Sequence, residues 1–531
     1  MRVLALTATL AGLAVGCDAK RETLRHRRDP GALVVAQAAD VISLDPVRAT
    51  DSESIEVGEL IFEGLVGWQA GTTDIEPRLA TFWQVSDDGL RWTFNLRSHV
   101  SFHDGTRFDA DAVVFSFERL LVKGHPQSIG DAAGHYWRSQ LNDVDRVVAI
   151  DPLTVEIHTR RKYAPLLGNL AMFPMVSPSA VKKWGPKFAD HPVGTGPFAF
   201  EDWIKESRVV VRRYEDYWGQ PAGLNEIVFQ VVVDARQRLI NLESGSVDLA
   251  TAILPDEQPF VELHPDLELH HAAGNDISYL AFNTQRPPFD DVRVRRAGNY
   301  AVNKEPIVKL GYQGRAIAAD SPLPPSMWGY HQPATRYQYD PVAAKRLLAE
   351  AAADGKFDPN RVYKLYAPST PRPYLPQPER VVRFIQASLE QAGIRTELIM
   401  QPYPQFRATV QAGEHDLCVF GWVGDTGDPD NFLYVLLHSK QSNTETGAQN
   451  VALYRDKEVD DMLVAAQEAA DQPTRSALYA AVQDKIASDA PWVPIAHSEL
   501  VVAGRVELVD VVLSPTGHPV YPRIRRRAEG R

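Results

Sequence analysis

The chain has 531 residues, enough for about two to four domains and a sizeable apolar core. Its 68 acidic and 56 basic residues give a formal net charge of −12, which disfavours a large nucleic-acid interface, and the hydrophobic content of 44% disfavours long disorder. With only two cysteines, Cys17 and Cys418, the chain has neither a disulfide framework nor a cysteine-rich zinc site. The fold must therefore be stabilised by packing.

The first 17 residues predict an export signal. Arg2 precedes an apolar or small-residue run from Val3 to Gly16, and Cys17 follows. The run has about 14 residues, fewer than the roughly 20 that a membrane-spanning helix needs, so we expect it to be cleaved. The segment resembles a bacterial lipoprotein signal peptide, in which the cysteine becomes the lipid-modified N-terminus, although Ala14 stands where that family prefers leucine. A plain secretory signal with an incidental cysteine is the alternative.

Residues 18–32 predict a solvated tether, because the segment is rich in charged side chains of both signs. Its attraction to anionic lipid would be weak and sensitive to salt. No later stretch is long and apolar enough to suggest a membrane span. We therefore expect the body of the protein in an extracytoplasmic aqueous space, anchored to a membrane through lipid on Cys17.

From Leu33 onward, strand-like and helix-like patterns alternate, which favours an α/β construction. The expected strands are 33–36, 92–96, 209–211, 227–233 and 416–422, which are apolar runs or alternate bulky with polar residues. Apolar residues at helical spacing predict helices over 109–121, 292–300, 341–353, 378–392 and 457–469. Proline stands at or near the start of the third and fourth of these helices, where its missing N–H costs little.

Ordered blocks of residues along the body carry a resemblance to one family. They include Ser86-Asp87-Asp88-Gly89, Trp92-Thr93-Phe94, Phe102-His103-Asp104-Gly105, Val193-Gly194-Thr195-Gly196-Pro197-Phe198, Tyr279-Leu280-Ala281-Phe282-Asn283 and Gly421-Trp422. In this order the blocks resemble the large peptide-binding class of extracytoplasmic solute-binding proteins, family 5, that serves ABC importers. The match runs from about residue 33 to 520. Trp328-Gly329-Tyr330 and the segment from Gly424 to Phe432 make the likeness greatest to periplasmic dipeptide-binding proteins.

The resemblance implies a two-lobed periplasmic-binding-protein fold of the α/β class with a hinge. We expect the first lobe over 33–279, including an inserted subdomain, and the second lobe over 280–493. Residues 494–531 are then expected to return to the first lobe and end in a C-terminal tail. The family likeness also implies a monomer without a cofactor.

Two loops could bind opposite charges. The buried strand 416–422 leads into an acidic loop that contains Asp425, and ligands of α/β sheets bind beyond the carboxyl ends of strands. Arg372 lies in a proline-stiffened loop just ahead of the helix that starts near Pro378, and a guanidinium group there suits a carboxylate. One loop thus offers an anion for an ammonium group and the other a cation for a carboxylate. Together they would bind the zwitterionic ends of a short peptide.

The resemblance implies the same roles for these residues. Asp425 aligns with the aspartate that binds the peptide amino terminus, and Arg372 aligns with the arginine that binds the carboxyl terminus. The remaining aligned positions are the ligand-lining aromatics Tyr374 and Trp422 and the first-lobe residues Thr50, Asp51 and Ser52. Binding between the lobes would close the hinge, and the permease subunits of the importer would recognise the closed form.

Structural interpretations of the same residues remain open. Arg372 could be a surface arginine paired with Glu379, and Trp422 could be core packing at a strand end. Asp428 and Asp430 suit turn formation and helix capping better than ligand binding. A calcium site in this loop is disfavoured, because the spacing lacks the EF-hand pattern.

Three further motifs favour structural interpretations. Residues 194–199 imitate a dinucleotide fingerprint, but a strand-like stretch follows, so a structural turn is expected. His270 and His271 point to opposite faces of a strand, which disfavours a metal pair. Cys418 lies in an apolar strand and is expected to be an inert buried thiol. The sequence therefore predicts no metal site.

Three other functions compete with peptide transport. The chain lacks the serine-elbow, zinc-protease and phosphate-loop motifs, so no enzyme is predicted. A protein of the same fold could instead bind a nickel chelate, haem, glutathione or murein peptide, as relatives in this family do. A third possibility is a sensor that presents peptide to a chemoreceptor. The expected partners remain a short peptide, the membrane permease and the lipid at Cys17, with no nucleic acid.

Overall fold

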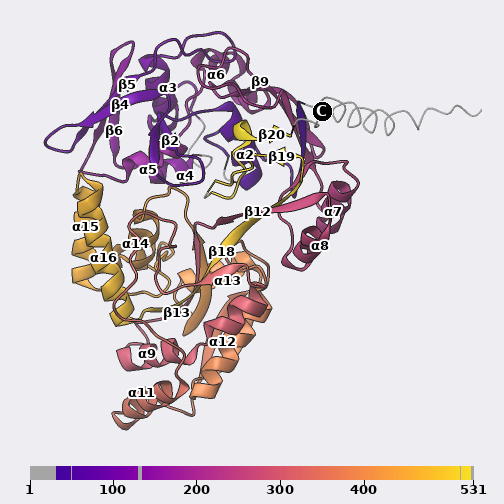
Figure 1. Ribbon diagram of the computed structural model, residues 1–531. Coiled ribbons are helices and arrows are strands. Elements are labelled where there is room, and N and C mark those ends of the chain that lie inside the picture. Colours follow the sequence, from indigo (N-terminus) through magenta and orange to yellow (C-terminus); the bar gives the residue numbers. More distant parts are fainter. Residues whose placement is uncertain (1–30, 50, 129–133, 515, 528–531) are drawn as a thin grey trace, which may run out of the picture.

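The computed structural model describes residues 31–49, 51–128, 134–514 and 516–527 (Figure 1). The predicted signal peptide with Cys17, nearly all of the tether, and Thr50 lie outside these described residues. Within the described ranges, no helix is long and apolar enough to span a membrane.

One large mixed sheet runs through the whole molecule. Its main path is β16-β15-β17-β13-β18-β11-β1-β10-β9-β8, while β12 and β14 pair with β18 off this path. The strands on one side of β18 are β1 (Ala32–Gln37), β8 (Phe198–Ile204), β9 (Arg208–Arg213), β10 (Glu226–Val231), β11 (Leu249–Ala250) and β12 (Leu267–Ala273). The strands on the other side are β13 (Asp276–Phe282), β14 (Ala316–Ala318), β15 (Val362–Pro368), β16 (Arg395–Gln401) and β17 (Leu417–Val423). Strand β18 (Trp492–Arg505) joins the two halves.

The two halves of this sheet form two lobes with separate cores. The first lobe, built on β1 and β8–β12, has a core that includes Leu33, Phe229 and Tyr521. The second lobe, built on β13–β17, has cores on both faces of its sheet. Its strands β15, β16 and β17 pair in parallel, which requires crossover helices such as α12 (Pro378–Ala392). The predicted two-lobed α/β fold is confirmed, whereas the exact lobe limits remain a prediction.

The first lobe carries an additional antiparallel sheet with its own core. Its order is β4-β5-β7-β6, formed by β4 (Ala80–Val85), β5 (Arg91–Leu96), β6 (Val144–Asp151) and β7 (Thr154–Thr159). Helix α3 (Ala110–Leu121) packs on β6 and β7, and Phe94 and Phe117 are buried in this core. The arrangement matches the kind of inserted subdomain expected within the first lobe.

Most predicted elements form within one or two residues of the expected bounds. The first-lobe helices are α2 (Ser52–Ile61), α3, α4 (His135–Gln140), α5 (Leu166–Met172), α6 (Pro178–Trp184), α7 (Ala235–Glu243) and α8 (Gln258–Leu263). The second-lobe helices are α9 (Val292–Ala301), α10 (Lys304–Pro306), α11 (Pro341–Ala353), α12, α13 (Tyr403–Gln411), α14 (Asp430–Leu437), α15 (Lys457–Glu468) and α16 (Gln472–Asp489). The short pairs β2 (Val66–Trp68) with β3 (Ile75–Pro77) and β19 (Leu508–Val509) with β20 (Arg525–Arg526) complete the strands.

The predicted strand over 227–233 ends earlier than expected. Strand β10 stops at Val231, because Asp234 then caps helix α7 by accepting from the backbone N–H of Gln237 at 2.7 Å. Val233 in the connection is 76% exposed, so its β-branched side chain does not mark a buried strand position.

The structural interpretation of the turn at 194–199 is confirmed, and His103 packs against this turn. A Cβ on Gly194 would lie 2.0 Å from the carbonyl oxygen of Ile61, so the turn needs glycine for close packing on the end of α2. The Nε2 atom of His103 lies 2.9 Å from the carbonyl oxygen of Gly196, and burial lowers the pKa of His103 to about 4. This histidine is a neutral structural residue.

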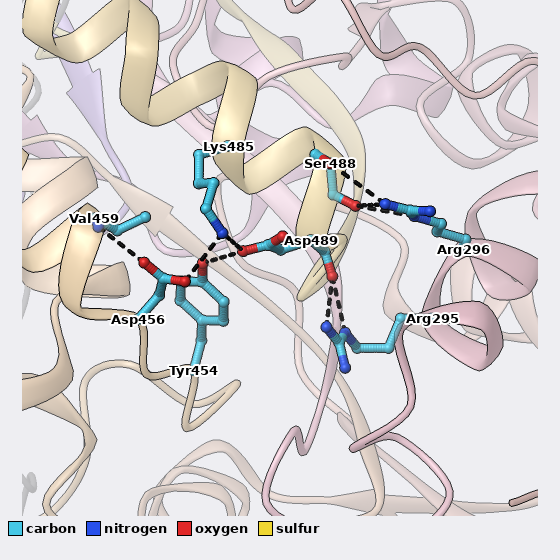
Figure 2. A network of polar contacts seen from close by, with 8 residues as sticks. All are labelled: Arg295, Arg296, Tyr454, Asp456, Val459, Lys485, Ser488 and Asp489. Carbon is cyan, nitrogen blue, oxygen red and sulfur yellow. Dashed lines mark hydrogen bonds and ion pairs between the residues drawn. The ribbon is translucent and has the colours of Figure 1, made fainter.

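The end of the longest helix, α16, is tied to neighbouring segments of the second lobe (Figure 2). Arg295 in α9 donates to the carbonyl oxygen of Asp489 at 2.7 and 2.9 Å, and Arg296 donates to that of Ser488. The side chain of Asp489 accepts from Tyr454 and Lys485. These donors satisfy carbonyl groups that a helix end leaves without partners, so the network stabilises the packing of α16 on α9.

The two lobes are connected at a narrow hinge. The chain passes from β12 to β13 through Gly274, and β18 crosses in the opposite direction beside it. The carboxylate of Asp276 accepts from the backbone N–H of Ser498 at 2.8 Å and from its hydroxyl. Burial raises the pKa of Asp276 to about 7. The crossing strands are thus joined by a buried carboxyl group as well as by backbone pairing.

Candidate functional site

The acidic loop after β17, residues 424–431, is held tightly against the second lobe; we call it the Asp425 loop. Gly424 donates to the carbonyl oxygen of Asn275 at 2.7 Å, and the Asn275 side chain donates back to Gly424 at 3.0 Å. Asn431 accepts from the indole N–H of Trp422 at 2.8 Å and from the backbone N–H of Asp425 at 3.1 Å. The loop therefore presents Asp425 in a defined position.

Asp425 is the acidic group expected to bind an ammonium. Burial raises the pKa of its carboxyl group to about 6, and the hydroxyl of Tyr136 donates a hydrogen bond that acts in the opposite direction. Tyr136 lies in α4 of the first lobe, so this bond crosses between the lobes. Among the described residues, no cationic side chain forms an ion pair with Asp425. A desolvated carboxylate without a counter-ion is suited to a cationic ligand group.

Arg372 lies in a tight turn beyond the end of β15. Its backbone exchanges hydrogen bonds with Leu375 at 3.0 and 2.9 Å. The guanidinium group stacks on the ring of Tyr403 at 4.0 Å, and its buried Nε has no hydrogen-bond partner within the described part of the chain. The alternative pairing with Glu379 is wrong, because Glu379 instead accepts from Arg383 at 2.8 and 3.0 Å.

Tyr374 packs directly against the strand that leads to Asp425. A Cβ on Gly421 would lie 2.2 Å from Cδ2 of Tyr374, so the glycine allows the ring to contact β17. The carbonyl oxygen of Tyr374 accepts from the hydroxyl of Tyr312 at 2.9 Å. Burial and the neighbouring hydroxyl of Tyr403 raise the pKa of Tyr374, whereas the positive charge of Arg372 opposes that shift. The side chain of Tyr374 therefore stays neutral.

Parallel pairing places the two charged loops at the same edge of the second-lobe sheet. Strands β15 and β17 pair with Leu365 opposite Leu417. Arg372 follows the end of β15 by four residues, and Asp425 follows the end of β17 by two. Both side chains therefore belong to the carboxyl edge of one parallel sheet, the place where α/β proteins bind ligands.

The other acidic residues of the Asp425 loop are structural. Asp428 accepts from the backbone N–H of Asp430 at 3.0 Å, as expected for a capping residue, and forms a bidentate ion pair with Arg475 at 2.7 and 2.8 Å. Asp430 accepts from the side chain of Gln467 at 2.9 and 3.1 Å. Over the described ranges, no group of three or more histidine, cysteine, aspartate or glutamate side chains could hold a metal ion.

Two of the three first-lobe residues predicted from the resemblance, Asp51 and Ser52, lie at the start of α2. Asp51 caps α2 by accepting from the backbone N–H of Ser54 at 2.8 Å, and its Oδ2 is buried without a hydrogen-bond partner. Ser52 is exposed, and Thr50 lies outside the described residues. For Asp51 and Ser52, the described chain shows no hydrogen bond or ion pair to Asp425 or Arg372. Their role as ligand contacts stays a prediction.

Different first-lobe residues approach the Asp425 loop. A Cβ on Gly427 would lie 2.8 Å from Cβ of Thr73 and 3.3 Å from Nε1 of Trp68. Together with Tyr136, these residues cover the loop from the first lobe. Sequence reasoning missed all three, because Trp68 ends the three-residue strand β2, Thr73 lies in the connection after it, and Tyr136 lies in a six-residue helix without a distinctive motif.

Comparisons with known proteins agree with this architecture. The profile for bacterial extracellular solute-binding proteins, family 5 Middle, matches residues 74–444. The chain is 32% identical over 540 residues to heme-binding protein A of Haemophilus influenzae, and this alignment covers 97% of each chain. It is 33% identical over 473 residues to the dipeptide-binding protein of Escherichia coli, and this alignment covers 86% of this chain and 87% of the relative.

A solved structure shows the same arrangement of the two lobes. HbpA2 from Haemophilus parasuis matches with a TM-score of 0.87 and 27% sequence identity, over 93% of this chain and 99% of that chain. The family profile covers most of the body, and the relatives align over nearly the full chain. This chain therefore belongs to family 5 of the bacterial extracellular solute-binding proteins.

Proposed function

We propose that this protein is the binding component of an ABC importer that captures free dipeptides or short oligopeptides between its two lobes. The observation that carries the proposal is the pair of opposite charges at one sheet edge. Asp425 has no ion-paired cation, and the buried Nε of Arg372 has no hydrogen-bond partner, among the described residues. A ligand with an ammonium group and a carboxylate would satisfy both.

The aromatic surroundings suit a ligand whose side chains vary. Tyr374 and Tyr403 adjoin Arg372, and Trp422 lies beside the Asp425 loop, so the fixed polar contacts would go to the two charged ends. Aromatic walls accept many side chains through apolar contact. We therefore expect selectivity for free termini and tolerance toward peptide sequence.

Haem is the competing ligand, because a relative that aligns over 97% of this chain is named a heme-binding protein. Haem carries two propionate groups and no ammonium. Arg372 could accept one propionate, but the desolvated carboxylate of Asp425 would repel such an anionic ligand. The charge at Asp425 thus favours a peptide. Glutathione, murein peptide and nickel chelates remain comparison ligands for the same titration.

We further propose that the mature chain is a monomer outside the cytoplasm, anchored by lipid on Cys17, with its first lobe over 33–279 and its second over 280–493. Its closed form would deliver peptide to the permease subunits, or present it to a chemoreceptor in the sensor alternative. Mass spectrometry of the mature N-terminus tests the anchor, and an unmodified first residue other than Cys17 would refute it.

The ligand is tested by calorimetric titration of protein that has been unfolded, washed free of bound solute and refolded. Free dipeptides are compared with the same peptides acetylated at the amino end or amidated at the carboxyl end. We expect only the free dipeptides to bind tightly. Equal binding of the capped peptides, or binding of haem alone, would refute the proposal. We expect the dipeptides to remain uncleaved when they are incubated with the protein.

A further inference from the structure

Gln467 occupies an unusual position between the two lobes. It lies at the end of α15 in the second lobe and is 1% exposed. Its side-chain oxygen accepts from Nη1 of Arg161 at 2.7 Å, and its backbone carbonyl accepts from the N–H of Ala164 at 2.7 Å. Arg161 and Ala164 both belong to the first lobe. Figure 1 shows the upper end of α15 just below the first lobe, consistent with these contacts.

In the first lobe, neighbouring residues already hold the Arg161 side chain in the orientation that this contact needs. Arg161 is held by Asp143 through two hydrogen bonds of 2.9 and 2.8 Å, and its guanidinium lies over the ring of Tyr163 at 4.9 Å. These contacts orient Nε, Nη2 and the guanidinium plane of Arg161 within the first lobe alone. The remaining Nη1 points to Gln467, so little side-chain freedom is lost when the lobes meet.

The second-lobe side of the contact leads to the Asp425 loop. The amide nitrogen of Gln467 donates to both carboxylate oxygens of Asp430, the first residue of α14. Arg475 supports the same region, because it donates to the carbonyl oxygen of Ala466 at 3.0 Å and pairs with Asp428. The end of α15 thus supports the loop that carries Asp425.

The chemistry of the partners determines which way the Gln467 amide faces. A guanidinium group only donates, so it requires the amide oxygen. A carboxylate only accepts, so it requires the amide nitrogen. With Arg161 on one side and Asp430 on the other, only one orientation satisfies both. If Arg161 leaves, the amide oxygen loses its donor, and only the two hydrogen bonds to Asp430 still orient the amide.

We propose that Gln467 is a positioning residue that couples closure of the lobes to the order of the Asp425 loop. While the lobes are in contact, Arg161 holds the amide so that its nitrogen donates to Asp430. When the lobes separate, Arg161 and Ala164 withdraw, and the brace on the first turn of α14 weakens. Closure therefore strengthens the loop, and the loop in turn favours closure around a ligand. The inference rests on the proposed function only in placing the ligand at Asp425.

The experiment compares three variants by rapid-mixing kinetics with free dialanine. Arg161→Ala should increase the dissociation rate about tenfold and leave the association rate nearly unchanged, because it removes a charge-assisted bond made only on closure. Gln467→Met should increase dissociation at least as much. The double variant should behave like Gln467→Met alone, because Arg161 acts through Gln467. Additive effects, or wild-type dissociation from Arg161→Ala, would overturn the inference.

Arg160→Ala is the matched control. Arg160 is the neighbouring first-lobe arginine, its side chain is 56% exposed, and it pairs with Asp145 instead of with the second lobe. It should leave both rates unchanged. If wild-type protein does not bind dialanine, the proposed ligand class is wrong, and small-angle scattering of ligand-free protein then tests the coupling. Arg161→Ala should increase the radius of gyration and Arg160→Ala should not; equal radii would overturn the inference.

Discussion

The hydroxyl of Tyr136 in the first lobe donates a hydrogen bond to the carboxylate of Asp425 in the second. Burial of both groups raises the pKa of Tyr136 and the pKa of Asp425, the latter to about 6. The first lobe therefore contacts the same carboxylate that we propose for the ligand ammonium. This relationship makes the protonation of Asp425 measurable through both binding and stability.

Binding of a free dipeptide should weaken as the pH decreases through about 6, because a protonated Asp425 no longer attracts an ammonium group. Affinity should be level above about pH 7. Tyr136→Phe removes a bond that lowers the pKa of Asp425, so the midpoint should move to higher pH. Calorimetric titrations across this range check both effects. Identical pH profiles for the two proteins would contradict the role of Tyr136.

The free energy of unfolding of the ligand-free protein should change in the opposite direction to peptide affinity, and should decrease as the pH rises. The folded state keeps the proton on Asp425 up to about pH 6, whereas the unfolded state releases it near the ordinary aspartate pKa of 3.8. The free energy of unfolding therefore falls between these values, and the loss is complete above about pH 6. Asp425→Asn cannot ionise and should be more stable than wild type by roughly 1–3 kcal/mol at pH 8, but similar at pH 4. Urea unfolding at both pH values measures this, and equal stability at pH 8 would exclude it.

Arg372→Met should abolish discrimination between free and amidated dipeptides. The change removes the guanidinium proposed for the ligand carboxylate, and we expect affinity for free dipeptides to fall about 10- to 100-fold. Arg383→Ala is the control, because that arginine pairs with Glu379 on an exposed helix surface. Retained preference for a free carboxylate in Arg372→Met would remove Arg372 from the site.

Gly421→Ala should destabilise the protein by roughly 1–3 kcal/mol, because the new methyl would meet Tyr374 at 2.2 Å and the carbonyl oxygen of Ile277 at 2.6 Å. Gly58→Ala is the control. That glycine lies within α2 with nothing within 4 Å of the added Cβ, so stability should rise by about 0.5–1 kcal/mol. Thermal unfolding compares the two variants. An unchanged melting temperature for Gly421→Ala would show that the segment carrying Tyr374 moves aside easily.

Arg475→Met should destabilise the protein by about 3–5 kcal/mol, because it leaves Asp428 buried without its bidentate partner. The double variant Arg475→Met with Asp428→Asn should recover part of this loss, since it removes the unpaired charge. Chemical denaturation of the single and double variants makes the comparison. Equal destabilisation of the two would show that lost packing, and not the buried charge, causes the effect.

Local patterns predicted much of the fold because they arise from short-range physics. The apolar spacing over 378–392 and 341–353 reproduces α12 and α11 at the same bounds, and the apolar strand 416–422 is shifted by only one residue in β17. Helix and strand periods depend on which face is buried, and that information is contained in a short window. The apolar spacing does not predict α16, although it is the longest helix in the described part of the chain.

The sequence by itself determined the fold class and the two charges at one sheet edge, because Arg372 and Asp425 follow strands whose hydrophobic patterns are legible. Only the tertiary structure decided that Glu379 pairs with Arg383, that Tyr136 contacts Asp425 and that Arg161 meets Gln467. Each of the last two pairs joins residues about 300 positions apart on different lobes, as the separation of 306 for Arg161 and Gln467 shows. Such contacts depend on how the lobes close, and no local pattern encodes that geometry.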